Sequence, residues 1–239
     1  MRQPLNGARA ALRYGAGPPI ADEAALASAL VALRSLDPTV VDHLIEVGGP
    51  PPLRLGKPGF AGLAAIVVGQ QVSTASAAAI LGRLEAAVMP LVADQLLAAS
   101  DATLRAVGLS AGKVRTLRTL AAAIEDGTLD LDGLAAQPAE VAHATLCAVR
   151  GIGPWTADSF LLFCLGHPDA WPAGDLALQE AARVALRLNA RPNTVTLDAI
   201  GDRWKPWRGV AARLLWAYYR ALKQGRSSGA LLAAPEENA

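Results

Sequence analysis

Leu146-Cys-Ala-Val-Arg-Gly-Ile-Gly-Pro-Trp-Thr-Ala-Asp158 is the stretch of this 239-residue chain that says most about its fold. Two helical patterns meet within this stretch, and a short loop separates them. In that loop Gly151 and Gly153 can adopt positive φ angles. Pro154 suits the first turn of the second helix, whose outward-facing amides could bind a phosphate. A tight helix–helix connection without a ligand fits equally well. A dinucleotide-binding loop is disfavoured, because the third glycine and the preceding strand are missing.

Helical patterns recur about every fifteen residues through the rest of the chain. Side chains that commonly cap helices stand where those patterns begin, namely Asp37 before Pro38, Ser73 and Ser110. No segment shows the sustained alternation of apolar and polar residues that is typical of a half-buried strand. The apolar content, 52% of the chain, rests on alanine and leucine more than on aromatic residues, which favours close packing of helices. The sequence therefore predicts an all-α fold.

Charge and cysteine content exclude some classes of protein and leave others open. The net charge of +1 neither indicates nor excludes nucleic acid, because DNA affinity depends on where the phosphate contacts lie. Cys147 and Cys164 are too few for a disulfide framework or an iron–sulfur cluster. Residues 1–12 lack the layout of a signal peptide, and the longest apolar stretch is broken by Gln70 and Gln71. We therefore expect a cytoplasmic protein that does not span the membrane.

Five segments, taken together, resemble one known family. The hairpin resembles the helix-hairpin-helix of the DNA glycosylase superfamily, and Asp169-Ala-Trp-Pro-Ala-Gly-Asp175 is similar to the loop that carries the catalytic aspartate there. Three further segments agree best with the bacterial 3-methyladenine DNA glycosylase II branch: Gly69-Gln-Gln-Val-Ser73, Gly108-Leu-Ser-Ala-Gly-Lys113, and Arg203-Trp-Lys-Pro-Trp-Arg208 followed by Trp216. The matches follow the family's order over residues 60–220.

The resemblance implies two all-α lobes with a DNA-binding cleft between them and the helix-hairpin-helix at that cleft. It places residues 21–60 and 160–224 in a lobe formed by both ends of the chain. Residues 61–159 would form the central lobe, which ends in the hairpin at 146–158. Outside these, composition predicts a loosely ordered start at residues 1–20 and a disordered tail at 225–239.

Asp175 is the residue that the resemblance assigns to catalysis. In that role its carboxylate stabilises the oxocarbenium-like sugar as the base departs, or orients a water. Glycosidic cleavage usually needs two carboxyl groups. An alkylated purine already carries positive charge and leaves well, so one carboxylate can suffice. From the residues alone, a helix N-cap is the favoured role for Asp175, since Leu176-Ala-Leu-Gln-Glu-Ala follows it. The resemblance reverses that order, and both roles can coexist.

Trp155 and Trp216 are the candidates for the pocket that receives the damaged base, because an electron-rich ring attracts a cationic purine. Tryptophans are more commonly core residues, and the chain has five. Ser159 would also line the pocket, and the best-known relative has an aromatic residue there. In bifunctional relatives a lysine that forms a Schiff base occupies the position of Trp155, so the resemblance implies no lyase step.

The resemblance also implies a set of DNA contacts. Gln70 and Gln71 lie where relatives place residues that enter the duplex, with Gln71 the better candidate for the wedge. Polar residues that satisfy the backbone at a helix start explain this pair equally well. Lys113 and Arg115 follow the Ser110 cap and could touch phosphates, although an exposed charged helix face explains them too. The complete expected set is Gly151, Ile152, Gly153, Thr156, Gln70, Gln71, Ser110 and Lys113.

The expected function is a monofunctional, monomeric glycosylase that acts on alkylated purines in double-stranded DNA at the bacterial nucleoid. No cofactor is expected, although hairpin carbonyls could hold a monovalent cation in the DNA complex. No metal site is predicted, because His143 and Cys147 share a helix face but lack further ligands. The alternatives are a glycosylase for deaminated or other lesions and a helix-hairpin-helix DNA-binding protein without catalysis.

Overall fold

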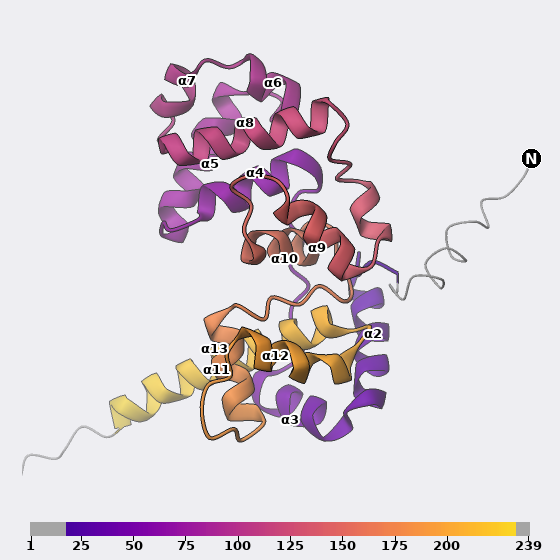
Figure 1. Cartoon of the computed structure of the whole chain (residues 1–239). Coiled ribbons are helices and arrows are strands. Elements are labelled where there is room, and N and C mark those ends of the chain that lie inside the picture. The colour runs from indigo at the N-terminus through magenta and orange to yellow at the C-terminus, as the bar shows by residue number, and fades with distance from the viewer. Residues whose placement is uncertain (1–17, 233–239) are drawn as a thin grey trace, which may run out of the picture. The chain divides into compact units, whose positions relative to one another are not determined.

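The structure of the chain is a computed structural model that describes residues 18–232. These residues form helices joined by loops and contain no β-strand (Figure 1), so the all-α prediction is confirmed. Within this range, none of the helices combines the length and the apolar character needed to cross a membrane. The chain divides into two compact units, and each consists of segments that are distant in sequence.

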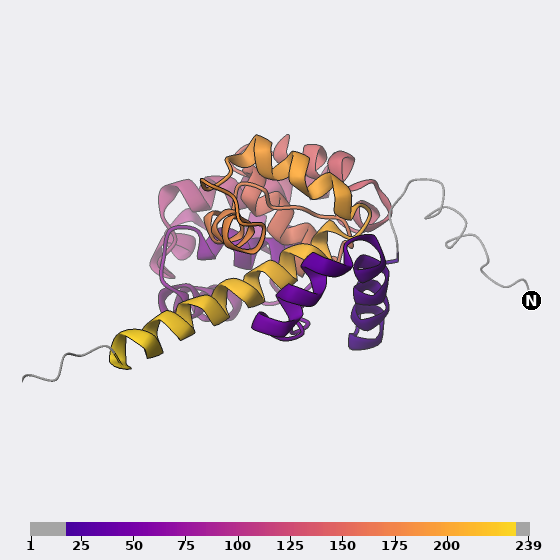
Figure 2. The ribbon, with the colours of Figure 1, turned by 90° about the horizontal axis from the view of Figure 1, so that it is seen from below.

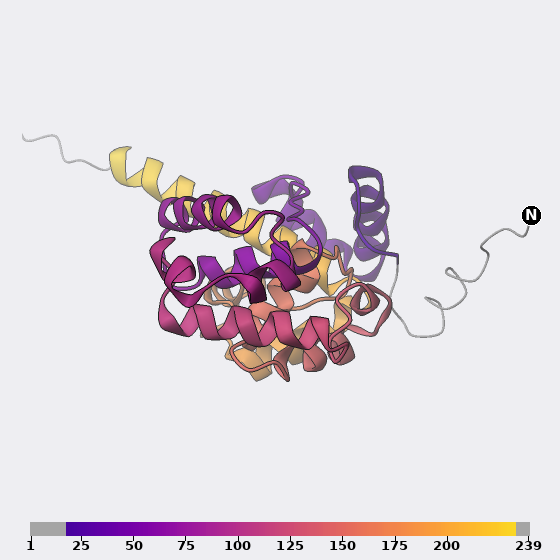
Figure 3. The same ribbon diagram turned by 90° about the horizontal axis from the view of Figure 1, so that it is seen from above.

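Unit 1 comprises residues 54–170, together with the described residues 18–21. Helix α8 (Ala111–Glu125) lies in the middle of this unit, where it packs against α4, α6 and α7 (Figures 1 and 3). Its buried face consists of Val114, Leu117, Leu120 and Ala121. The other elements are α4 (Gly59–Gly69), α5 (Thr74–Ala87), α6 (Ala93–Ala98), α7 (Asp101–Ala106), the 3-10 helix η1 (Gly133–Ala136), α9 (Ala139–Cys147) and α10 (Pro154–Phe163).

Unit 2 comprises residues 22–53 and the described residues from 171 onward. The long helix α13 (Arg208–Leu232) is its central element and packs against α2 (Glu23–Leu36), α3 (Pro38–Gly48) and α11 (Leu176–Ala185), as Figure 2 shows for α2 and α3. The end of α3 approaches α13 closely, because a Cβ atom at Gly48 would lie 2.6 Å from the backbone nitrogen of Tyr218. The unit is completed by α12 (Thr194–Gly201) and the 3-10 helix η2 (Asp202–Trp204).

Short polar side chains determine where most of these helices begin. Each accepts a hydrogen bond from a backbone amide of the first turn, which would otherwise lack a partner. The predicted caps Asp37, Ser73 and Ser110 act in this way on α3, α5 and α8. The remaining side-chain caps are Asp22 on α2, Ser100 on α7, Asp175 on α11 and Asn193 on α12.

The unit boundaries differ from those predicted from the sequence. They fall at 53/54 and 170/171, whereas the prediction placed them at 60/61 and 159/160. Helix α10 continues through residue 159 to Phe163, and the Gly56 amide donates to the Phe163 carbonyl at 2.7 Å. These contacts join residues 54–60 and 160–170 to the unit that carries the hairpin.

The two ends of the chain also differ from expectation where they are described. Ile20 is buried, and its amide donates to the Gly166 carbonyl at 2.7 Å, so residues 18–20 belong to unit 1. Helix α13 reaches Leu232, so the segment 225–232 is helical and not a disordered tail. Gly225 does not end the helix, because one glycine costs only about 1 kcal/mol in a helix interior. Residues 1–17 and 233–239 of the two predicted flexible ends lie outside the described range.

Replacing Asp37 with alanine is expected to destabilise unit 2 by about 2–3 kcal/mol. Its carboxylate caps α3 and also accepts a hydrogen bond from the indole nitrogen of Trp204 at 3.0 Å. The Trp204 side chain is 1% exposed, so the substitution would leave a buried donor without its acceptor. Urea denaturation would measure the loss, with Asp22→Ala as the control because Asp22 is an exposed cap. Equal losses in the two variants would contradict a special role for the Asp37–Trp204 bond.

Candidate functional site

The hairpin between α9 and α10 is a tight, internally bonded loop. The Val149 amide donates to the Leu146 carbonyl at 3.1 Å, and the Ile152 amide donates to the Val149 carbonyl at 3.0 Å. Ile152 is only 5% exposed, so its side chain anchors the loop in unit 1. A DNA contact by Ile152, as expected from the sequence, is therefore confined to its backbone.

The two hairpin glycines have different structural roles. Gly151 has a φ of +98°, and a Cβ atom there would overlap the hydroxyl oxygen of Thr116 on α8. Both its backbone conformation and its packing therefore require glycine. Gly153 has a φ of −94°, in contrast to the expected positive value, and a Cβ atom there would meet no atom within 4 Å. The packing of the protein itself thus does not explain the glycine at 153.

The N-terminus of α10 lacks a side-chain cap, because Gly153 occupies the capping position and Pro154 follows it. Trp155, in the first turn, is 46% exposed. Thr156 is buried, and its hydroxyl oxygen accepts a hydrogen bond from the side-chain amide of Gln70 at 2.8 Å. The start of α10 therefore combines an exposed ring with a helix N-terminus suited to an anion.

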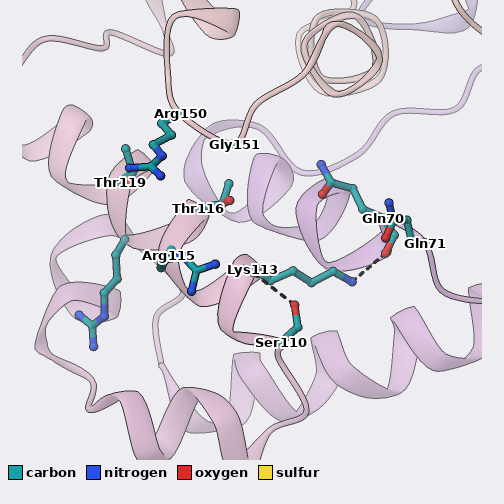
Figure 4. Close-up of a pocket in the computed structure, with 11 residues that line it drawn as sticks. Gln70, Gln71, Ser110, Lys113, Arg115, Thr116, Thr119, Arg150 and Gly151 are labelled. Carbon is teal, nitrogen blue, oxygen red and sulfur yellow. Dashed lines mark hydrogen bonds between the residues drawn. The ribbon is translucent and has the colours of Figure 1, made fainter.

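Gln70 and Gln71 form the turn that follows α4. Gln71 is exposed and has a φ of +56°, a left-handed conformation that non-glycine residues adopt uncommonly. The Lys113 ammonium donates to two backbone carbonyls in this region, to that of Val68 at 2.6 Å and to that of Gln70 at 2.8 Å. Figure 4 shows the second of these hydrogen bonds. Strained, exposed residues held in place by their surroundings are often functional, and Gln71 fits that description.

Ser110 and Lys113 both have structural roles. The role of Ser110 as a helix cap was predicted, whereas that of Lys113 was not. The Lys113 ammonium bonds to backbone carbonyls of the turn after α4, and burial lowers its pKa. The Ser110 hydroxyl accepts from the Lys113 amide at 3.3 Å and caps α8. Lys113 thus supports the turn that presents Gln71, whereas the sequence offered a phosphate contact or an exposed charged helix face for this lysine.

A concave surface brings most of the expected DNA-binding residues of unit 1 together. It has a volume of about 560 Å³, and we call it the hairpin pocket. Its lining consists of Gly69, Gln70, Gln71, Gly151, Gly153, Pro154, Trp155 and Thr156. A neighbouring hollow of about 580 Å³ shares Gln70, Gln71 and Gly151 with it and extends along α8 to Ser110 and Lys113.

Asp175 is the cap of α11 in unit 2, and its carboxylate is firmly positioned. Oδ1 accepts hydrogen bonds from the Leu178 amide at 2.9 Å and from the Trp216 indole nitrogen at 3.1 Å. The side chain is half-buried. The capping interpretation is therefore correct for Asp175, and it leaves the catalytic one open.

The loop that leads to Asp175 is braced by residues that the sequence reasoning missed. The Trp171 indole nitrogen donates to the Leu197 carbonyl at 3.3 Å, and Gly201 leaves room for the Trp171 ring. The buried side chain of Gln179 donates to the Ala173 carbonyl at 2.9 Å. The sequence could not predict this contact of Gln179, because its partner lies in the loop before the helix and not in the helix itself.

The four expected base-pocket and catalytic residues are divided between the units. Trp155 and Ser159 lie one turn apart on α10 in unit 1, whereas Asp175 and Trp216 lie in unit 2. Ser159 is 3% exposed, and its hydroxyl has no hydrogen-bond partner among the described residues. The Trp216 indole nitrogen donates to the Asp175 carboxylate, a contact that the sequence analysis did not predict.

His143 and Cys147 share a face of α9, as expected, and Asp158 on α10 completes a short chain of contacts. His143 Nδ1 lies 2.8 Å from Asp158 Oδ1, and its Nε2 lies 3.4 Å from Cys147 Sγ. Burial, followed by the nearby Asp158 charge, raises the pKa of the Cys147 thiol. Residues 18–232 contain no group of three or more His, Cys, Asp or Glu side chains arranged to hold a metal ion. The contacts tie the two hairpin helices together.

Comparison with known proteins matches residues 64–206 to the family described as HhH-GPD superfamily base excision DNA repair protein. A protein of Mycobacterium tuberculosis named probable bifunctional transcriptional activator/DNA repair enzyme AlkA is 38% identical over 162 residues, which cover 63% of this chain and 31% of that protein. The chain spans about one third of the length of the first curated relatives it matches.

Two solved structures are similar in fold and sequence. The DNA-3-methyladenine glycosidase of Bacillus halodurans has a TM-score of 0.73 and 32% identity, with 84% of this chain and 94% of that chain covered. The 3-methyladenine DNA glycosylase Mag1 of Schizosaccharomyces pombe, in complex with abasic DNA, has a TM-score of 0.67 and 25% identity, with 79% and 95% covered.

Proposed function

Because this chain belongs to the HhH-GPD superfamily of base excision DNA repair proteins, we propose that it is a DNA glycosylase for alkylated purines. The reaction would hydrolyse the N-glycosidic bond of 3-methyladenine or 7-methylguanine in double-stranded DNA and leave an abasic site. The observation that carries the proposal is the Asp175 carboxylate, which Leu178 and Trp216 hold at the start of α11. The names of the similar bacterial and yeast structures support this substrate class.

The proposed reaction requires mainly one well-positioned negative charge from the protein. A methylated purine is cationic, so it departs as a neutral base without prior protonation. The sugar then develops positive charge, which the Asp175 carboxylate stabilises electrostatically until water attacks. The hydrogen bonds from Leu178 and Trp216 fix the orientation of this carboxylate.

The hairpin is the element that we assign to the DNA backbone. The N-terminus of α10, which follows the hairpin loop, has no side-chain cap, and Gly153 leaves open space in front of it. A phosphate oxygen can approach the backbone closely at such a position. The Gln70–Thr156 hydrogen bond ties the Gln71 turn to the same helix start. A phosphate bound there would thus be held at a defined distance from Gln71.

Gln71 is the residue that we propose enters the duplex. Removal of a base from the stack leaves a gap, and a side chain that fills it offsets part of the unstacking cost. The left-handed backbone at Gln71, braced by the Lys113 ammonium on the adjacent carbonyls, presents the side chain outward at low entropic cost. Lys113 thereby supports DNA binding through the turn and need not itself contact a phosphate.

Trp155 remains our candidate for the ring that stacks on the damaged base, since it is exposed at the start of α10. The same residue makes the enzyme monofunctional, because an indole cannot form the Schiff base through which lyases cut the strand. Ser159, one helical turn further on, offers a buried hydroxyl to the base. Trp216 contributes mainly by orienting Asp175.

We further propose that the protein acts as a monomer at the nucleoid and needs no cofactor for chemistry. A monovalent cation would be held by hairpin carbonyls in the DNA complex, since such ions take oxygen ligands. The Val149 carbonyl, which already accepts the Ile152 amide, has a second lone pair for this purpose.

Base release from methylated duplex DNA is the test of the proposed activity. The native protein is expected to release 3-methyladenine and 7-methylguanine, and the strand should stay intact until alkali cleaves the abasic site. Borohydride should trap no covalent complex, because Trp155 replaces the lysine of a lyase. Release only from DNA that contains deaminated purines would change the substrate class. Binding of DNA without release of any base would leave a non-catalytic binding protein.

A further inference from the structure

The hollow beside the hairpin pocket carries a concentrated positive charge. It lies between α8, the hairpin loop and the Gln70–Gln71 turn (Figure 4). Its lining contains four basic side chains and no acidic one, in a chain whose 22 basic residues nearly balance 21 acidic ones. We call it the arginine pocket; its lining residues are Gln70, Gln71, Ser110, Gly112, Lys113, Arg115, Thr116, Arg118, Thr119, Arg150 and Gly151.

Two of the four basic side chains already have partners inside the protein. The Lys113 ammonium bonds to the Val68 and Gln70 carbonyls. The Arg118 guanidinium forms an ion pair with Asp101 at 2.8 Å and donates to two further carbonyls near the end of α6. These contacts explain both residues as parts of the fold.

Arg115 and Arg150 have no such explanation. Both are exposed, and neither side chain makes a hydrogen bond or an ion pair with another described residue. They come from different elements, α8 and the hairpin loop, yet they line the same hollow, as do the hydroxyl-bearing Thr116 and Thr119 (Figure 4). Guanidinium groups and hydroxyls are the donors that proteins use for phosphate oxygens.

The position of the Gln70–Gln71 turn indicates which phosphate this pocket would meet. Gln70, Gln71 and Gly151 line both the hairpin pocket and the arginine pocket, so the turn stands between two sites suited to anions. A side chain that enters the stack from the minor groove, about 6 Å wide, has the backbone of one strand on each side. If the N-terminus of α10 holds the lesion strand, the backbone beyond Gln71 belongs to the opposite strand.

We propose that Arg115 and Arg150 bind a backbone phosphate of the strand opposite the lesion. This inference rests on the proposed function, in that the protein binds duplex DNA with Gln71 in the stack. It gives the arginine pocket a role separate from the hairpin amides. The two sites together would grip both strands on either side of the wedge, and would thereby hold the duplex open around the flipped nucleotide.

The test measures binding of duplex DNA by the Arg115→Gln, Arg150→Gln and doubly substituted proteins. A duplex with one non-cleavable abasic-site analogue fixes the register, so binding can be read whether or not bases are released. The double variant is expected to bind about 10-fold more weakly at physiological salt. Its slope of log K against log salt should fall by about 1, as for the loss of one phosphate contact. Arg105→Gln is the matched control, since Arg105 is an exposed arginine on α7 outside the pocket.

Single neutral methylphosphonate substitutions then identify the strand. At one position of the strand opposite the abasic site, the methylphosphonate should lower the DNA affinity of the native protein. The same methylphosphonate should leave the DNA affinity of the double variant unchanged. Native-like affinity and salt slope in the double variant would overturn the arginine pocket as a DNA site. If the methylphosphonate that affects only the native protein lies instead in the strand that contains the abasic site, the assignment to the opposite strand would be overturned. Neither result depends on base release, so failure of the glycosylase activity is detected separately.

Discussion

Replacing Asp175 with asparagine is expected to lower the rate of base release from methylated DNA by about 10²–10³-fold or more. The amide oxygen of asparagine can still accept the hydrogen bonds from the Leu178 amide and the Trp216 indole. Asparagine is also as good a helix cap as aspartate, so the stability of α11 should change little. What the variant loses is the negative charge that stabilises the sugar cation. Single-turnover kinetics with enzyme in excess would measure this step directly.

Trp216→Phe is the companion variant, because it keeps an aromatic ring and removes the donor to Asp175. A loss of about 10-fold in the chemical rate is expected, the size of one hydrogen bond to a charged group. If Asp175→Asn instead releases bases at the native rate and melts at the native temperature, Asp175 is a helix cap only. The catalytic assignment would then be wrong, although the capping contact would stand.

Asp175 illustrates how far the sequence could be taken and where it stops. Its cap on α11 was predictable, because the partner amide lies three residues away and the helical pattern follows at once. The contact with Trp216 was not predictable, since the indole comes from a helix 41 residues further along the chain. The resemblance to a known family identified both residues, but it suggested the base pocket for Trp216.

Lys113 shows a different limit. A lysine in the first turn of an exposed helix is compatible with a phosphate, with solvent, or with another part of the protein. In the structure the ammonium reaches the carbonyls at the end of α4, which lack partners within their own helix. That choice depends on how α4 packs against α8, which no local pattern specifies. The helix boundaries, by contrast, followed well from local caps at Asp37, Ser73 and Ser110.

The boundaries of the two units were missed for a related reason. Helical periodicity and resemblance suggested a division within α10, but the end of α10 also holds the segment around Gly56 through a backbone hydrogen bond. Such a pairing between residues 107 positions apart leaves no periodic trace in the sequence. The tail prediction failed at residues 225–232, because a small and polar composition weakens a helix without ending it.

Substitution by alanine is expected to lower the stability of the protein at Gly151 but not at Gly153. Gly151→Ala should lower the free energy of unfolding by about 3 kcal/mol, from the left-handed backbone and from overlap with Thr116. In a domain of this size that corresponds to a fall in Tm of about 6–12 °C. Gly153→Ala should leave Tm within about 2 °C, since its backbone suits alanine and the added methyl group meets nothing within 4 Å.

DNA binding should rank these variants differently. The methyl group of Gly153→Ala points into open space at the start of α10, where the proposal places a phosphate, so affinity for duplex DNA should fall by about 10-fold while the fold is kept. Thr116→Gly in the Gly151→Ala protein removes the overlapping side chain and should restore part of the lost stability. Fluorescence anisotropy at fixed salt and thermal denaturation would measure the two effects on the same samples. Native affinity in Gly153→Ala would mean that the phosphate does not reach the hairpin amides, because a bound phosphate leaves no room there for a methyl group.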